Sequence, residues 1–255
     1  MDYDAYRGMF EGQSKNRLGL LIWMSHPAWP SLLWQTYDYF FDTDAGYYGA
    51  KKAAEPLHVQ WNAATDDVEV VNYNAGDQTA LTAHAQVIDM DGSVKWEKGV
   101  AIDSHEDSTA SPIHLEFPAG LARTHFIRLT LARGSEIVSS NFYLHGRTEG
   151  DYQGIRELAG AKVDAKSAIK RNGVRWELRT ELHNTSKVPA LMVRVKVVRS
   201  KSDDLIVPAL FSDNYIALMP GEKRTIYISL EDADTRGEKP RIRVDGYNIV
   251  RPNHP

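Results

Sequence analysis

The chain has 255 residues, of which 42% are hydrophobic and 25% are charged, and its formal net charge is −4. This composition excludes a disordered chain, and the acidic balance argues against nucleic-acid binding. The absence of cysteine excludes disulfides, thiolate metal sites and thiol catalysis, and fits a periplasmic or secreted protein as well as a cytosolic one. No window approaches ~20 uninterrupted apolar residues, and the first residues are unlike a signal peptide, so we predict no membrane partner.

Aromatic residues are concentrated in residues 1–62, which hold 13 of the 25 phenylalanines, tyrosines and tryptophans. The apolar spacing over Tyr3–Arg17 predicts a helix. The continuous apolar run Leu18–Met24 is typical of a strand buried on both faces, as in a parallel sheet. A long aromatic loop follows, and Ala45–Glu55 predicts a second helix. This order of elements indicates a piece of a βα repeat rather than a complete domain.

A single parallel strand at Leu18–Met24 has no partner in the sequence that follows, so its backbone groups would be unsatisfied. We expect one of two outcomes. Either the run is covered by self-association, or residues 1–40 form loop and helix packed on the next domain.

The remainder of the chain predicts short strands separated by turns. In Val174–Leu182, apolar and charged residues alternate, as on a half-buried strand. Similar runs are Val68–Asn74, Ala80–Ile88, Thr124–Leu131, Glu136–Leu144, Leu191–Val198 and Arg224–Leu230. Strands at this spacing predict two β-sandwiches, over residues 63–150 and 151–255.

Three stretches carry a family resemblance: Trp23–Tyr39, Gly46–Gln60 and Phe211–Glu222. The chain resembles the C-terminal region of glycoside hydrolase family 2, in its exo-β-D-glucosaminidase and endo-β-mannosidase branches. The resemblance implies a mainly β fold with two immunoglobulin-like sandwiches after the end of a (β/α)8 barrel. Residues 1–62 would be the barrel piece, 63–150 the first sandwich and 151–255 the C-terminal sandwich.

The resemblance also implies O-glycosyl bond hydrolysis with retention, which uses two glutamates ~5–5.5 Å apart. In the family these glutamates lie on barrel strands upstream of the stretch seen here. The glutamates of the barrel piece, Glu11 and Glu55, both fall in predicted helices. We therefore expect this chain to contain no catalytic residue and to be inactive alone, as the C-terminal fragment of an enzyme whose partner is a β-linked glucosaminide, mannoside or related oligosaccharide.

By the same resemblance, four residues are expected to bind substrate. Trp23 would lie at the barrel rim and form the floor of the sugar subsite, since an indole stacks on the apolar face of a sugar. Trp34, Tyr37 and Asp38 would border the pocket, with Asp38 bonded to a sugar hydroxyl or amine. Alternatively, Trp34 and Tyr37 pack the barrel against the next domain. The histidines show no zinc-like spacing, so we predict no metal and no cofactor.

Two other functions stay open. In the first, the sandwiches themselves form a non-catalytic carbohydrate-binding module, which predicts a row of exposed aromatic side chains on one sheet face. A structural protein that uses the barrel piece for docking predicts a stable oligomer.

Overall fold

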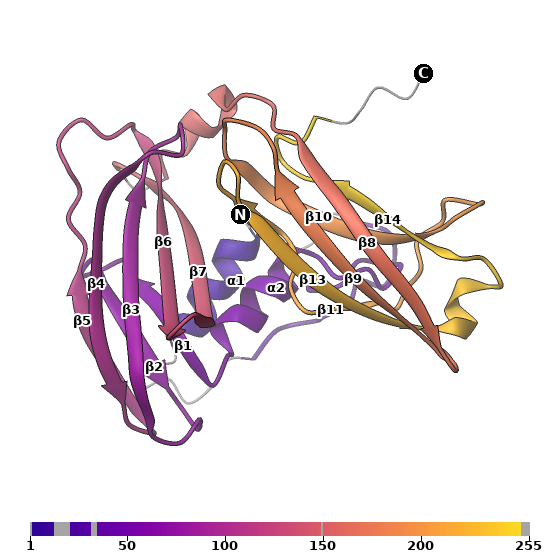
Figure 1. Ribbon diagram of the computed structural model, residues 1–255, viewed down its shortest axis with the longest axis horizontal. Helices are drawn as coiled ribbons and strands as arrows, with labels where there is room; N and C mark the ends of the chain where they lie inside the picture. The colour runs from indigo at the N-terminus through magenta and orange to yellow at the C-terminus, as the bar shows by residue number, and fades with distance from the viewer. Residues whose placement is uncertain (1, 13–20, 32–34, 149, 251–255) are drawn as a thin grey trace. The chain divides into compact units, whose positions relative to one another are not determined.

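The computed structural model describes residues 2–12, 21–31, 35–148 and 150–250 (Figure 1). The helices are α1 (Asp2–Glu11), α2 (Ala45–Ala53) and the short 3-10 helices η2 (Gln153–Glu157) and η3 (Asp232–Thr235). The first seven strands are β1 (Leu57–Asn62), β2 (Asp67–Asn72), β3 (Gln78–Ile88), β4 (Val94–Ser104), β5 (Ser108–His114), β6 (Thr124–Arg133) and β7 (Glu136–Gly146). The last seven are β8 (Val163–Asn172), β9 (Arg175–Asn184), β10 (Ala190–Arg199), β11 (Leu210–Phe211), β12 (Ile216–Leu218), β13 (Lys223–Glu231) and β14 (Pro240–Asp245).

The chain forms two compact units, each built from two separate stretches of sequence. Unit 1 comprises Met1–Leu21 and Gly49–Glu157, and unit 2 comprises Ile22–Tyr48 and Leu158–Pro255. Each unit contains two antiparallel sheets and its own hydrophobic core. The predicted mainly β fold with two sandwiches is confirmed, and the division at residues 62 and 150 stays a prediction.

The sandwich of unit 1 packs the sheet β1-β2-β5 against the sheet β4-β3-β6-β7 (Figure 1). Alternate residues of β3 and β6 point inward, as the period of a half-buried strand requires. The fully buried core side chains include Val59, Val68, Val70, Leu81, Ile113, Ile127, Leu129 and Leu131.

Helix α1 is attached to β7 of unit 1 by a buried polar network. The Arg7 guanidinium is 2% exposed and donates to the Phe142 carbonyl at 2.6 Å. It lies over the Tyr143 ring, with its carbon 3.7 Å from the ring centroid. The Tyr143 hydroxyl donates to Glu11 at 2.6 Å. Because these groups lose their contact with water, their mutual hydrogen bonds and charges determine where the helix docks.

Gly49 of α2 permits a close approach to α1. A Cβ added at this position would lie 2.1 Å from the Tyr3 carbonyl oxygen and 3.2 Å from the Arg7 amide nitrogen. Any larger residue would therefore separate the two backbones, which explains the glycine in this segment.

A histidine pair links β6 and β7 at one end of the same sandwich. His145 Nδ1 lies 2.8 Å from His125 Nε2, and His125 Nδ1 lies 3.2 Å from the Ala122 carbonyl. Since the carbonyl can only accept, His125 Nδ1 carries a hydrogen, and in the neutral ring His125 Nε2 then accepts from His145 Nδ1. Burial lowers the pKa of both histidines. The ring of Phe117 lies against both of them, and the ring of Trp61 lies against that of His145.

The histidine pair is expected to destabilise unit 1 when the pH falls below about 6.5. The ordinary pKa of histidine is 6.5, and in the folded state both values lie lower. The unfolded chain therefore binds protons first on acidification, and this favours unfolding. Native-state hydrogen exchange of β6 and β7 amides at pH 7.5 and 5.5 measures the effect. His145→Gln should flatten this pH dependence and the exposed control His105→Gln should not; an unchanged profile in His145→Gln would contradict the assignment.

The sandwich of unit 2 packs the sheet β11-β13-β9-β8 against the sheet β12-β10-β14. As the alternation predicts, Leu178, Thr180 and Leu182 of β9 point into the core, with Trp176 at its edge. Val174 is 72% exposed instead, because it lies in the turn before β9.

The prediction of a buried strand over Leu18–Met24 is wrong for the part that the structure describes. Residues 18–20 lie outside the described residues, and residues 21–24 are neither strand nor buried, with Leu21 98% exposed. A strand is stabilised by neighbouring strands, and among the described residues no strand pairs with residues 21–24. None of the helices in the described residues is long and apolar enough to cross a membrane.

Candidate functional site

The segment between the two helices carries the predicted sugar-binding residues, and its first part exposes large aromatic side chains. Trp23 is 78% exposed and Trp29 is 65% exposed. The structure therefore places Trp23 on an open surface rather than in a pocket. Trp34 lies outside the described residues.

The second part of the segment is a tight loop closed by Asp38. Its Oδ1 accepts hydrogen bonds from the backbone amides of Phe40 at 2.8 Å and Asp42 at 3.0 Å. The Asp38 amide in turn donates to the Asp42 carbonyl at 2.9 Å. An aspartate that accepts from amides further along the chain is typical of a turn, so one oxygen of Asp38 has a structural role.

Tyr37 lies beside Asp38 at the entrance to this loop. It forms an isolated antiparallel bridge with Thr43, and its amide donates to the Ser25 carbonyl at 3.1 Å. Its ring lies 5.7 Å from that of Tyr47, the two planes tilted by 59°. Burial raises the pKa of Tyr37, so the phenol stays protonated and can donate a hydrogen bond.

The loop is attached to the sandwich of unit 2 through Asp42. Its Oδ2 forms an ion pair with Nη2 of Arg194 on β10. Burial raises the pKa of Asp42, and the charge of Arg194 opposes this shift. Arg194 in turn lies over the ring of Tyr215, 5.5 Å from its centroid.

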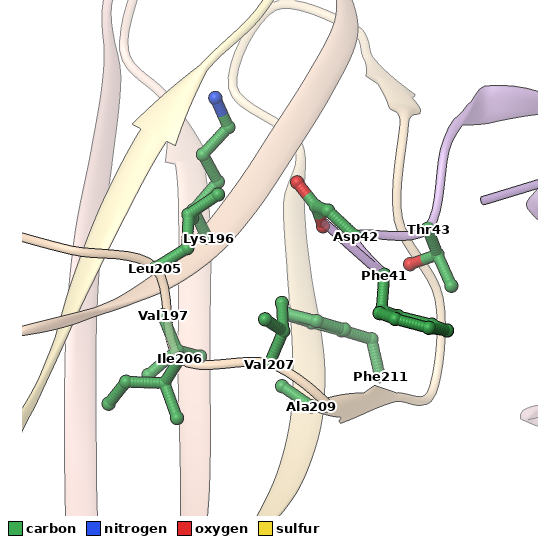
Figure 2. A pocket seen from close by; sticks show the side chains of 10 residues that line it. All are labelled: Phe41, Asp42, Thr43, Lys196, Val197, Leu205, Ile206, Val207, Ala209 and Phe211. Carbon is green, nitrogen blue, oxygen red and sulfur yellow. The ribbon is translucent and has the colours of Figure 1, made fainter. Parts of the chain in front are cut away.

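A small hollow lies between residues 41–43 and this sandwich, as Figure 2 shows. Its walls are the apolar side chains of Phe41, Val207 and Phe211, with Asp42 and Lys196 at one side (Figure 2). The cavity volume is about 10 Å³, which is space for about one water molecule. A sugar ring does not fit there, so this hollow is a small gap in the packing of residues 41–43 on the sandwich and not a substrate site.

The two glutamates of the predicted barrel piece have structural partners. Glu11 is 7% exposed and accepts from Tyr143, and burial raises the pKa of Glu11. Glu55 accepts from Ser139 at 2.7 Å and from Lys52 at 2.9 Å. Within the described ranges, no three histidine, aspartate or glutamate side chains are grouped where they could hold a metal ion.

The exposed aromatic residues of the sandwiches do not form a row in the part of the chain that the structure describes. Tyr227 of β13 is 58% exposed, Tyr247 follows β14, and Tyr152 lies before η2. Each comes from a different element, so the observation that would favour a carbohydrate-binding sandwich is missing there.

Of the four predicted site residues, the structure brings together Tyr37 and Asp38 and leaves Trp23 apart on an open surface. The sequence analysis missed Arg194 and Tyr215, which hold the loop. Tyr215 lies in the stretch Phe211–Glu222 that carries the family resemblance, so the resemblance could have pointed to Tyr215 as a site residue. Nothing in the spacing pointed to Arg194.

Residues 141–249 match the family model described as the exo-β-D-glucosaminidase Ig-fold domain. The remainder of the chain also has relatives among glycosidases. The exo-β-D-glucosaminidase of Streptomyces avermitilis is 30% identical over 278 residues, which cover 99% of this chain and 31% of the relative. The mannosylglycoprotein endo-β-mannosidase of Lilium longiflorum is 26% identical, with 97% of this chain and 33% of the relative covered.

Among solved structures, the exo-chitosanase CsxA of Amycolatopsis orientalis is similar to 97% of this chain, with a TM-score of 0.90 and 28% identity. The chain covers 33% of that structure. It thus spans about a third of the length of the relatives it matches. The resemblance to the C-terminal region of exo-β-D-glucosaminidases and endo-β-mannosidases is confirmed.

Proposed function

We propose that this chain is the C-terminal part of a retaining glycoside hydrolase that acts on β-linked glucosaminides or mannosides. The observation that carries the proposal is the similarity to an exo-β-D-glucosaminidase over 99% of the chain, through both units. A relative of this kind from Amycolatopsis orientalis was solved in complex with PNP-β-D-glucosamine. The chain supplies the two sandwiches and part of the sugar-pocket wall, including Trp23, Trp34, Tyr37 and Asp38.

Both catalytic glutamates lie, in this proposal, outside these 255 residues. The engagement of Glu11 with Tyr143 and of Glu55 with Ser139 supports this, because a nucleophile or acid must reach the sugar. The test is hydrolysis of p-nitrophenyl β-D-glucosaminide, β-D-mannoside and β-D-galactoside. We expect turnover only by the longest native reading frame that contains the chain. Turnover by these 255 residues alone would overturn the proposal.

Asp38 is the residue we expect to distinguish an amino sugar from a neutral one. Asp38→Asn retains the oxygen that accepts from Phe40 and Asp42, so the loop should keep its shape. Loss of the charge should raise KM for the glucosaminide at least about tenfold, since a hydrogen bond to a charged group contributes about 1.5–3 kcal/mol. KM for the mannoside should not change. Equal effects on both sugars, or an effect as large in the exposed control Asp164→Asn, would contradict this role.

The chain by itself should self-associate through its exposed aromatic segment, because Leu21, Trp23, Trp29, Phe40 and Phe41 are all at least 60% exposed. Sedimentation velocity should show a mass that rises with concentration. Joint replacement Trp23→Ser and Trp29→Ser should favour the monomer, whereas Tyr227→Ser, an exposed aromatic residue of β13, should not. A monomer at every concentration would contradict the prediction.

A further inference from the structure

Two stretches from opposite ends of the chain meet in unit 2. Residues 42–48 come from the segment before the first sandwich, and residues 194 and 214–215 belong to the last sandwich. The meeting point is an ion pair between Asp42 and Arg194, whose positions are 152 residues apart in the sequence. Both side chains are largely buried, with 14% and 23% of their surfaces exposed, so water screens the pair less than a surface pair.

Tyr215 adds a second attachment. Its ring stacks under the Arg194 guanidinium, and its hydroxyl donates to the Thr43 carbonyl at 3.4 Å. The Tyr48 ring, 1% exposed, lies 5.8 Å from that of Tyr215, and the Tyr48 hydroxyl lies 3.1 Å from Thr43 Oγ1. Residues 42, 43 and 48 are therefore all in contact with one small cluster, made of Arg194 and Tyr215.

The backbone of Tyr215 is held in an uncommon conformation to make these contacts. Its φ of 54° lies in the left-handed region, which a bulky residue adopts only when its surroundings require it. The preceding Asn214 is 3% exposed and bonds to both backbone groups of Val195, which holds the position. Such backbone conformations persist where the surrounding structure fixes the direction of a side chain, here that of Tyr215.

Asp42 connects Arg194 to the candidate sugar-binding residues, because it also bonds to Asp38. Its amide donates to Asp38 Oδ1, and its carbonyl accepts from the Asp38 amide. A displacement of Asp42 therefore opens the turn that sets the direction of Asp38 and of its neighbour Tyr37.

We propose that Arg194 and Tyr215 are positioning residues of the C-terminal sandwich, which hold the loop of Tyr37 and Asp38 in the shape that binds the sugar. This inference rests on the proposed function. The last sandwich would thus set sugar affinity without touching the sugar. Arg194 acts through Asp42, and Tyr215 acts through Thr43 and through the orientation of Arg194.

The first arm of the test measures the loop in this chain by hydrogen exchange. Arg194→Met and Asp42→Asn should each speed exchange of the amides at 40 and 42 by about tenfold, because the ion pair no longer opposes opening of the loop. The double variant should be no worse than either single one, since both remove the same contact. The control Arg243→Met removes an ion pair with Asp203 on the same sandwich and should leave these amides unchanged.

The second arm measures kinetics in the longest native reading frame that contains the chain. Arg194→Met should raise KM for the glycoside about tenfold with kcat within about twofold of the wild type, because binding and not chemistry is altered. Arg194→Lys, which keeps the charge but not the planar stacking on Tyr215, should give an intermediate KM.

The exchange and kinetic measurements distinguish the role of Arg194 in holding the loop from its role in sugar binding and from the proposed function itself. Unchanged exchange at residues 40 and 42 overturns the role of Arg194 in holding the loop. Faster exchange with unchanged KM overturns its role in sugar binding. If the wild-type long form turns over none of the glycosides, the proposed function fails, and the exchange data alone judge the attachment.

Discussion

Replacement of Arg7 by methionine is expected to lower the free energy of unfolding of unit 1 by about 3–5 kcal/mol, the range for breaking a buried ion pair. The guanidinium is 2% exposed, and it bonds to Asp4 and to the Phe142 carbonyl. Its Nε lies 3.7 Å from Glu11. Methionine keeps much of the volume but removes the cation beside the buried Glu11.

The loss in free energy of unfolding caused by Arg7→Met should depend on pH. Burial raises the pKa of Glu11, and Arg7 opposes this shift. Without Arg7 the pKa rises further, and a carboxyl whose folded pKa exceeds its unfolded value destabilises the fold as the pH rises through it. The loss should therefore be larger at pH 7.5 than at pH 5. Urea unfolding at both values measures it, with the exposed Lys98→Met as control; a pH-independent loss would indicate packing alone.

Replacement of Asn214 by alanine is expected to destabilise unit 2 by about 3 kcal/mol. Its side-chain oxygen accepts from the Val195 amide at 2.7 Å, and its side-chain nitrogen donates to the Val195 carbonyl at 2.9 Å. If the pairing of Val193 with Ile216 were continued by two residues, Asn214 would stand opposite Val195. The amide thus replaces a backbone partner, and its removal leaves two buried groups of Val195 unsatisfied, each costing about 1–3 kcal/mol.

Thermal and urea unfolding of unit 2 check the Asn214→Ala prediction. Asn172→Ala, at the exposed end of β8, is the matched control and should change stability by less than about 0.5 kcal/mol. A loss in Asn214→Ala as small as that of the control would show that water satisfies Val195 instead.

Much of the fold follows from local pattern. The helix at Ala45–Ala53 and the strands with clear alternation, such as β3, β6 and β9, lie close to where the sequence predicts them. Their hydrophobic period and turn residues act over a few positions, so a single sequence carries the signal. The strands β4 and β8 were missed, because both faces of each are mostly exposed and no apolar alternation marks them.

The error at Leu18–Met24 and the omission of Arg194 have a common cause. The apolar run predicts a strand only if a neighbouring strand exists, and that condition concerns other parts of a protein. The pairing of Asp42 with Arg194 likewise depends on how distant segments fold back, which spacing does not encode. Of the candidate site, the sequence therefore pointed to Tyr37 and Asp38 but not to what holds them.

The interleaving of the two units also sets an order of events during synthesis. Residues 22–48 leave the ribosome before their partners in β10, because Arg194 follows Asp42 by 152 residues. At about 5–20 residues per second this delay is about 8–30 s. Throughout that interval the aromatic loop has none of its partners from β10, and the first sandwich can complete itself meanwhile. Until β10 is synthesised, the exposed aromatic side chains of this loop are free to form unwanted contacts. A ribosome-associated chaperone that binds apolar segments would protect the loop during this interval.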